Sequence, residues 1–553
     1  MSAATLAAVS VSAESSPVSD ISNGRATLGI ELGSTNIKAV LIGSDLQPIA
    51  SGASNWESQY REHNWTYALA DIHAGVKEAV AEMLAAAKRQ YGIYPQRLAA
   101  VGVSAMMHGY LAFNSANELL TPFRTWRNTN TGAAAAELSD MLNFNFPLRW
   151  SASHLYQAIL NNEKHLADIA FITTLAGYLH FQLTGQKVLG VGDASGMFPF
   201  DAETGDYDAT RLTQFDALAA QHGFAKPLQT LLPEVLPAGA AAGTLTPAGA
   251  HYLDPTGTIA PGALVCPPEG DAGTGMVATN AVAPRTGNVS VGTSIFAMVV
   301  LEHPLLNSHP EIDLVTTPDG NPVAMIHCNN GASELAAWVG LFGEFARMLR
   351  AGNAYVAQPG DNANIVYEAL LTAALPGDSA AGGLLAFNNL AGEPVTGLAA
   401  GRPMVVRAPD STLNLANFMR AQVYSIFAAL ALGMRLLAAE NVTVTSLAAH
   451  GGVFRTPIVA QRLLAAAVNA PVSVSDAAAQ GGAWGIALLA AYAKARQSGD
   501  ERDLPTWLNA EVFADSLVSV EYPQAIDVMG FATYLERYQA ALPVQSAAIM
   551  TIG

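Results

Sequence analysis

Two glycine turns of the same pattern, one in each half of the chain, constrain the fold most strongly. Each turn combines one glycine with two hydroxyl residues and lies between two apolar runs, which predicts a β-hairpin. The two turns consist of Gly33, Ser34 and Thr35, and of Gly292, Thr293 and Ser294. Repetition of this hairpin predicts two duplicated α/β domains that face each other across a cleft.

Length and composition agree with two domains. The chain has 553 residues, too many for one core, and 51% of them are hydrophobic. Its net charge of −18 excludes a nucleic-acid partner but permits a small phosphorylated ligand bound by backbone N–H groups. Two cysteines argue against a disulfide framework and indicate a reducing cytoplasm. No apolar run has the length of a membrane span, so no membrane partner is expected.

The chain divides into four predicted parts. Residues 1–26 are rich in Ser and Ala without a basic start, which predicts a disordered arm rather than a secretion signal. Residues 27–282 form the first domain, residues 283–497 the second, and residues 498–553 a C-terminal tail. The sequence leaves the oligomeric state open, a homodimer included.

The first glycine turn offers N–H and O–H donors that suit phosphate oxygens. Glu31 lies just before this turn, where its carboxylate could hold a metal ion through water. An ordinary hairpin with one exposed acid fits the same residues.

A single carboxylate, Asp271, follows a predicted strand at residues 263–266 and two prolines. Gly270 and Gly273 leave room beside it, so Asp271 suits a general base that must touch its substrate. The alternative is that Asp271 only caps the helix that follows, because aspartate is favoured at that position.

Polar residues after the predicted strand at 97–105 suit a ligand crevice. His108 and Asn128 could donate hydrogen bonds to hydroxyl groups, and Trp126 could cover the face of a sugar. Asp193 either binds substrate hydroxyls or serves as a turn residue. Burial of the histidine and tryptophan in an ordinary core is the alternative.

The second half predicts a long apolar helix at residues 413–439 and a strand at 446–449. Gly451 and Gly452 follow that strand and would let a flat ring lie against bare backbone. A helix at residues 477–495 completes a βαβα run, and its glycines predict tight packing against a ligand or another helix.

Together these motifs resemble the FGGY family of carbohydrate kinases from about residue 27 to residue 495, and within it the branch that acts on xylulose. The resemblance adds Lys38, Gly331, and Met107 with Gly109 on either side of His108 to the candidate site residues. It implies two actin-like, ribonuclease H-like domains, with ATP and Mg²⁺ between them. It assigns both glycine turns to phosphates and Gly451 with Gly452 to adenosine.

The same resemblance implies that Asp271 is the base that deprotonates the terminal hydroxyl of a ketopentose, D-xylulose first. Met107, His108, Trp126, Asn128 and Asp193 would surround the sugar. Glu31 stands where the family carries aspartate, which places the carboxylate one methylene further from the backbone. The alternatives are a kinase for another ketose or polyol, such as ribulose, erythrulose or glycerol, and a catalytically silent sugar or nucleotide sensor.

Overall fold

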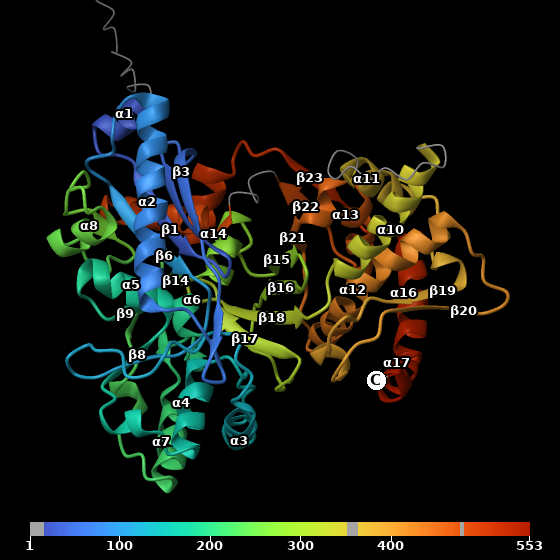
Figure 1. Cartoon of the computed structure of the whole chain (residues 1–553), viewed down its shortest axis with the longest axis horizontal. Helices are drawn as coiled ribbons and strands as arrows, with labels where there is room; N and C mark the ends of the chain where they lie inside the picture. Colours follow the sequence, from blue (N-terminus) through green and yellow to red (C-terminus); the bar gives the residue numbers. More distant parts are fainter. Residues whose placement is uncertain (1–15, 351–362, 476–480, 553) are drawn as a thin grey trace, which may run out of the picture.

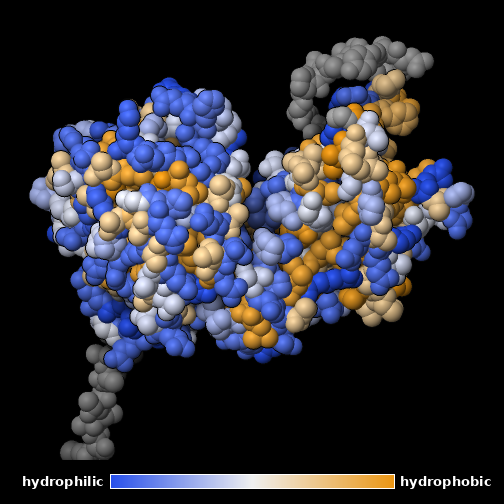
Figure 2. All heavy atoms as spheres, turned by 90° about the horizontal axis from the view of Figure 1, so that it is seen from below, coloured by the Kyte–Doolittle hydropathy of each residue, from blue (hydrophilic) through white to orange (hydrophobic). Residues whose placement is uncertain are grey.

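The computed structural model describes residues 16–350, 363–475 and 481–552, and they form two lobes (Figure 1). The first lobe contains a six-stranded sheet and the second a seven-stranded sheet. Figure 2 shows the two masses from below, with a narrower junction between them and more hydrophobic surface on the second lobe. The predicted division into two α/β domains is confirmed.

The first sheet has the order β13-β6-β1-β2-β3, with β14 also paired to β6. Its strands are β1 (Thr27–Leu32), β2 (Asn36–Ile42), β3 (Pro48–Asn55), β6 (Ala100–Ala105), β13 (Leu264–Val265) and β14 (Glu269–Gly270). β1, β2 and β3 form an antiparallel meander, while β6 runs parallel to β1. The predicted first hairpin is therefore present.

Helix α2 (Leu69–Tyr91) covers one face of this sheet, and α14 (Gly481–Gln497) packs on β1 and β6 from the other. This late helix, which follows β22 (Val472–Ser475) in the chain, therefore packs on the first sheet. A Cβ on Gly29 would overlap the Ala483 carbonyl and lie 2.8 Å from the Ala487 nitrogen. Glycine in β1 thus lets α14 lie directly on the backbone of the first sheet.

The rest of the first lobe consists mainly of helices, which lie beside or below the sheet in Figure 1. These are α3 (Gly132–Leu142), α4 (Ser151–Leu160), α5 (Leu175–Thr184), α6 (Val191–Ala194), α7 (Ala209–Gln221), α8 (Pro247–Leu253) and α9 (Asp271–Ala278). Four small strand pairs also lie in the described part of this lobe: β4 (Gln59–Arg61) with β5 (Asn64–Thr66), β7 (Leu111–Phe113) with β8 (Phe171–Thr173), β9 (Val188–Gly190) with β12 (Glu234–Leu236), and β10 (Phe200–Asp201) with β11 (Asp206–Tyr207).

The second sheet repeats the arrangement of the first. Its order is β17-β18-β16-β15-β21-β22-β23, in which β15 and β16 form an antiparallel hairpin and β21 runs parallel to β15. Its strands are β15 (Thr286–Val291), β16 (Ile295–Val300), β17 (Ile312–Thr316), β18 (Pro322–Cys328), β21 (Ser446–Gly451), β22 (Val472–Ser475) and β23 (Val518–Glu521). This repeat confirms the duplication predicted from the two glycine turns.

Helices α12 (Leu415–Ala439) and α13 (Val459–Val468) belong to the core of the second lobe, with α10 (Ser333–Arg350) and α11 (Ala363–Ala373) further out. By length and hydropathy α12 could cross a membrane, contrary to the expectation that no run reaches that length. Since 78% of its apolar window is buried inside the protein, α12 is a core helix.

Both chain ends differ from expectation. Of the predicted disordered arm, residues 1–15 lie outside the described residues, but α1 (Pro17–Ser22) is folded. The buried Asp20 carboxylate anchors it by accepting hydrogen bonds from the Ser44 backbone (2.8 Å) and the Arg25 guanidinium (2.8 Å). Asp20 therefore orders a segment whose composition alone indicates disorder.

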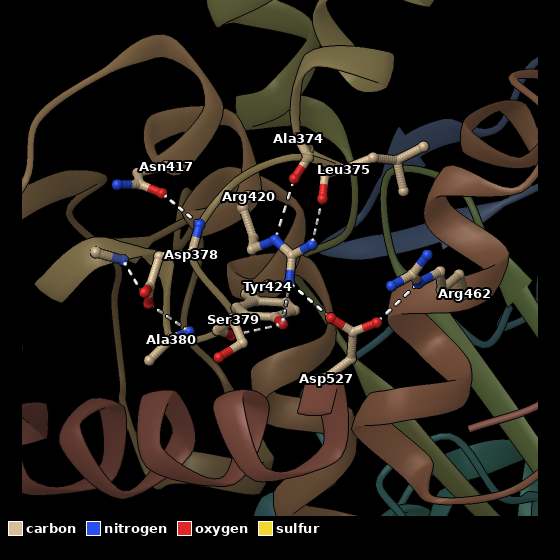
Figure 3. Close-up of polar contacts among 11 residues, drawn as sticks. Ala374, Leu375, Asp378, Ser379, Ala380, Asn417, Arg420, Tyr424, Arg462 and Asp527 are labelled. Atoms are coloured by element: carbon tan, nitrogen blue, oxygen red, sulfur yellow. Dashed lines mark hydrogen bonds and ion pairs between the residues drawn. The ribbon is translucent and has the colours of Figure 1, made fainter. Parts of the chain in front are cut away.

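The predicted tail is a structural part of the second lobe. Strand β23 extends the sheet, and α16 (Ala525–Ala540) packs on α13 and α12, with α17 (Leu542–Ile552) beyond it. Figure 3 shows how α16 is held: Asp527 accepts from Arg420 of α12 at 2.9 Å and from Arg462 of α13 at 2.7 Å. One buried carboxylate thus connects three helices.

Candidate active site

Asp271 lies at the point where β14 passes into α9. It is the first residue of the helix, and the N-cap is Gly270, which makes no side-chain cap bond. The alternative that Asp271 is merely the N-cap is therefore wrong. Its Oδ1 accepts a hydrogen bond from the Met107 N–H at 3.1 Å. Burial, with the nearby charge of Glu31, raises the pKa of Asp271 to about 6.

Glu31 lies on β1 at the N-terminus of α14. Its Oε2 accepts from the Ala483 N–H at 3.1 Å, and a side chain at Gly482 would overlap Oε1. Burial raises the pKa of Glu31, while the Lys38 ammonium, opposite it in the strand register, opposes the shift. Glu31, Lys38 and Asp271 are thus brought together in the first lobe.

These carboxylates fit a weakly held Mg²⁺. Among the residues that the structure describes, no three His, Cys, Asp or Glu side chains gather to form a complete metal site. Mg²⁺ in phosphoryl-transfer sites takes one or two carboxylates together with phosphates and waters. Glu31 and Asp271 offer that kind of incomplete anionic site, and the charge of Glu31 contributes to the raised pKa of Asp271.

The three carbonyl groups of the first glycine turn all accept hydrogen bonds from other parts of the first lobe. The Gly33 carbonyl accepts from the Trp56 indole (2.7 Å), the Ser34 carbonyl from the Tyr67 hydroxyl (2.7 Å), and the Thr35 carbonyl from the Trp56 N–H (3.1 Å). Within the described chain, the N–H groups of Ser34 and Thr35 have no acceptor, and both residues are exposed. The turn therefore presents donors, as a phosphate site requires.

The second glycine turn has the same property. Gly331 donates to the Thr293 carbonyl at 2.7 Å, and Ala332 donates to the Gly292 carbonyl at 2.8 Å. The N–H groups of Thr293 and Ser294 find no acceptor in the described parts of the chain. Gly331 is required here because a Cβ would overlap the Gly292 carbonyl.

Gly451 and Gly452 lie beside this turn. Gly451 is paired with Val291 in the sheet, has φ +128°, and has no room for a Cβ against the Val291 carbonyl. Gly452 is exposed, and a Cβ there would meet nothing within 4 Å. The structure thus groups the predicted nucleotide residues of the second half, with open backbone at Gly452.

The segment from Met107 to Gly109 turns sharply after β6. His108 has φ +69° and Gly109 φ +91°, and the turn directs the His108 Nδ1–H to the Gly196 carbonyl at 3.0 Å. Burial and the charge of Arg149 lower the pKa of His108 to about 3, so the ring is neutral. Nε2 is then an acceptor, which corrects the expectation that His108 donates to a hydroxyl.

Asn128 does not serve as predicted. Its amide donates to the Trp65 carbonyl (2.9 Å) and the Thr125 carbonyl (3.0 Å), and its oxygen accepts from the Trp65 N–H (2.7 Å). Both N–H groups are used, so Asn128 holds the Trp65 backbone in place instead of donating to a sugar. Trp126 is half-buried against the core of the first lobe.

Asp193 is fully buried on α6, so a substrate cannot touch it in this conformation. Its Oδ2 accepts from the Thr174 hydroxyl at 2.6 Å, while Oδ1 has no donor among the described residues. Burial, then the charge of Asp271, raises the pKa of Asp193 to about 7. The prediction that Asp193 contacts the sugar directly is therefore wrong in this conformation. Asp193 is instead a buried neighbour of Asp271.

Sequence reasoning missed several polar residues around these side chains. Glu269 is buried next to Asp193, and the Arg149–Asp313 ion pair joins the first lobe to β17. His327 stacks on Phe296 with ring centroids 4.1 Å apart. Only Glu269 could have been found from the sequence, because it is an acid directly before Gly270 and Asp271. The Arg149–Asp313 and Phe296–His327 pairs form between segments that are distant in the chain.

The sequence matches the N-terminal domain of the FGGY family of carbohydrate kinases over residues 26–259 and the C-terminal domain over residues 287–494. The chain belongs to the FGGY family of carbohydrate kinases. This FGGY kinase is accordingly a phosphotransferase that acts on a sugar hydroxyl, and ATP is the phosphoryl donor of the family.

Solved structures share the fold of this FGGY kinase at low identity. A xyloylose kinase from Brucella ovis is 20% identical with a TM-score of 0.74, covering 94% of this chain and 99% of its own. A gluconate kinase from Lactobacillus acidophilus is 17% identical (TM-score 0.73; 95% and 99% covered). A glycerol kinase from Plasmodium falciparum with ADP is 13% identical (TM-score 0.73; 94% and 98% covered). No curated protein matches the sequence.

Proposed function

We propose that this FGGY kinase transfers the γ-phosphoryl group of ATP to the terminal hydroxyl of an open-chain ketopentose, with D-xylulose as the first candidate. The observation that carries the proposal is the carboxylate of Asp271, largely buried but still partly exposed at the start of α9, with a raised pKa. A general base near neutral pH needs this combination of access and proton affinity.

In the proposed reaction, the two glycine turns bind the phosphates of ATP from the two lobes. The N–H groups of Ser34, Thr35, Thr293 and Ser294, which have no acceptor among the described residues, support this role. Gly452 leaves open backbone for adenosine. Glu31 would hold Mg²⁺, whose chemical contribution would be neutralisation of phosphate charge.

Asp271 then accepts the proton of the attacking hydroxyl. The Met107 N–H fixes Oδ1. In the proposed reaction Oδ2 faces the sugar. The neutral His108 ring accepts a hydrogen bond from another sugar hydroxyl through Nε2, and Trp126 covers the sugar. A base of this kind contributes about 10²–10⁴ to the rate.

A sugar panel tests the proposal. ADP release is measured with D-xylulose, D-ribulose, erythrulose, glycerol and gluconate at fixed ATP and Mg²⁺. We expect D-xylulose to give the highest kcat/KM. Preference for another sugar would change the substrate and keep the kinase, whereas no acceleration by any sugar would refute the function.

A catalytically silent sensor is the second candidate, because Glu31 replaces aspartate and is already engaged by the Ala483 N–H. Calorimetry separates the two. Binding of ATP and sugar without sugar-dependent ADP release would support the sensor, and turnover would exclude it.

A further inference from the structure

The strand that carries the predicted base has only two residues. β14 consists of Glu269 and Gly270, and one of its edges pairs with Ser104 and Ala105 of β6. So short a strand has few ladder bonds to fix its position. The position of Asp271, the next residue, therefore depends on what holds the other edge of β14.

The Glu269 carboxylate holds that edge to α6. It is 1% exposed, and its Oε1 accepts from the Gly192 N–H at 3.2 Å while Oε2 accepts from the Asp193 N–H at 3.0 Å. The Gly190 N–H donates to the Pro268 carbonyl at 2.8 Å. Two hydrogen bonds thus fasten β14 to the turn of α6, and a third joins the residues that directly precede these two elements.

The α6 turn has the shape that this carboxylate needs. A Cβ on Gly192 would lie 2.5 Å from Oε2 of Glu269, and one on Gly190 would overlap the same carboxylate. Two glycines therefore make room for a buried acid whose two oxygens accept these N–H donors. Burial and the charge of Asp193 raise the pKa of Glu269 to about 8, and the N–H donors only partly oppose that rise.

The opposite side of α6 contacts the second lobe. Thr316, at the end of β17, donates through its hydroxyl to the Val191 carbonyl at 3.1 Å, and through its N–H to the Ser195 hydroxyl at 3.0 Å. The α6 turn is thus held between Glu269 and the sheet whose β15–β16 turn carries Gly292 to Ser294.

We propose that Glu269 is a positioning residue for Asp271. By fastening β14 to α6, it fixes the base relative to the second lobe and so to the phosphates. The inference rests on the proposed function, which makes Asp271 the base. A misplacement of about 1 Å costs on the order of a hundredfold in rate.

Glu269→Gln is the main test, because it keeps the side-chain volume but turns an NH₂ group toward one of the two N–H donors. We expect kcat to fall about tenfold to a hundredfold, while KM for ATP changes little. Gly192→Ala should lower kcat by a similar factor, because its methyl group would displace the Glu269 carboxylate without removing it. This variant replaces Glu269→Gln as the test if Glu269→Gln does not fold.

Asp254→Asn is the matched control. Asp254 is also a buried acid of the first lobe, and it accepts from the Ile259 N–H at 3.0 Å, but it follows α8 at the outer side of the lobe in Figure 1. This variant should lower Tm without lowering kcat. Equal loss of kcat in both variants would mean that Glu269 is only structural and would overturn the inference.

A double variant decides whether Glu269 acts through Asp271. If it does, Asp271→Asn combined with Glu269→Gln is no slower than Asp271→Asn alone. The inference would be overturned if Glu269→Gln lowered kcat of the Asp271→Asn variant by the same factor by which it lowers kcat of the wild type. An unchanged kcat in the single variant Glu269→Gln would also overturn it. A wild type without sugar-dependent turnover would instead refute the proposed function, and the inference with it.

Discussion

Replacing Asp527 by asparagine tests whether the C-terminal segment is a structural part of the second lobe. Asp527 lies on α16 and accepts hydrogen bonds from Arg420 and Arg462 (Figure 3). The Arg420 side chain is 2% exposed, whereas that of Arg462 is 25% exposed. Asparagine would therefore leave both guanidinium groups without their counter-ion. That of Arg420 is buried, whereas that of Arg462 can be reached by water.

The magnitude follows from this difference in burial. Removing one partner of a buried ion pair costs about 3–5 kcal/mol. Arg420 keeps its hydrogen bonds to the carbonyls of Ala374 (3.0 Å) and Leu375 (2.8 Å), so we expect the lower end, about 3 kcal/mol. For a unit of about 200 residues this lowers Tm by roughly 6–12 °C.

The assay is thermal unfolding followed by calorimetry and circular dichroism. Glu511→Gln, which removes an acid paired with the exposed Arg502 at 2.7 Å, is the control and should leave Tm unchanged. A Tm of Asp527→Asn within about 2 °C of the wild type would refute the view that this carboxylate holds α16 to the lobe.

The effect should also depend on pH. Burial alone would raise the pKa of Asp527, but the hydrogen bonds from Arg420 and Arg462 outweigh it, and the pKa is lowered. A lowered folded-state pKa stabilises the protein above the unfolded-state pKa, and this stabilisation is lost as pH falls through the folded-state pKa. The difference in Tm between wild type and Asp527→Asn should therefore shrink in acid.

Three further predictions concern the first lobe. Gly29→Ala should destabilise the protein by about 1–3 kcal/mol, since the methyl group would push α14 off β1; denaturant unfolding with an unchanged midpoint would contradict this. Because Asp271 must be ionised to accept a proton and its pKa is about 6, kcat/KM should fall about tenfold per pH unit below pH 6, and a flat profile from pH 7 to 5 would count against the base. Glu31→Ala should raise the Mg²⁺ concentration needed for half-maximal rate, and an unchanged metal titration would exclude Glu31 from that role.

The features that the sequence predicted well are local. Both glycine turns and the strand before Gly451 depend on residues adjacent in the chain, and the structure contains them. The side of the protein on which a helix packs is not a local property. The helix that begins at Gly481 lies on the first lobe because Gly29 admits it, and no pattern within the helix specifies that partner.

The candidate site shows the same limit. Asp271 was identified from its own neighbours, but the roles of Asn128 and Asp193 depend on partners from other segments. The side chain of Asn128 is hydrogen-bonded to the Trp65 backbone, and Asp193 is buried beside Thr174 and Glu269. Hydrogen-bond partners brought together by folding decide whether a polar side chain faces a ligand or supports the backbone.

Turnover of Asp271→Asn with the best sugar of the panel tests the central claim most directly. The variant should bind ATP and sugar with Kd values near those of the wild type, measured by calorimetry, because the amide keeps the size of the carboxylate. Sugar-dependent ADP release should fall by about 10²–10⁴. Turnover near that of the wild type would show that Asp271 is not the base.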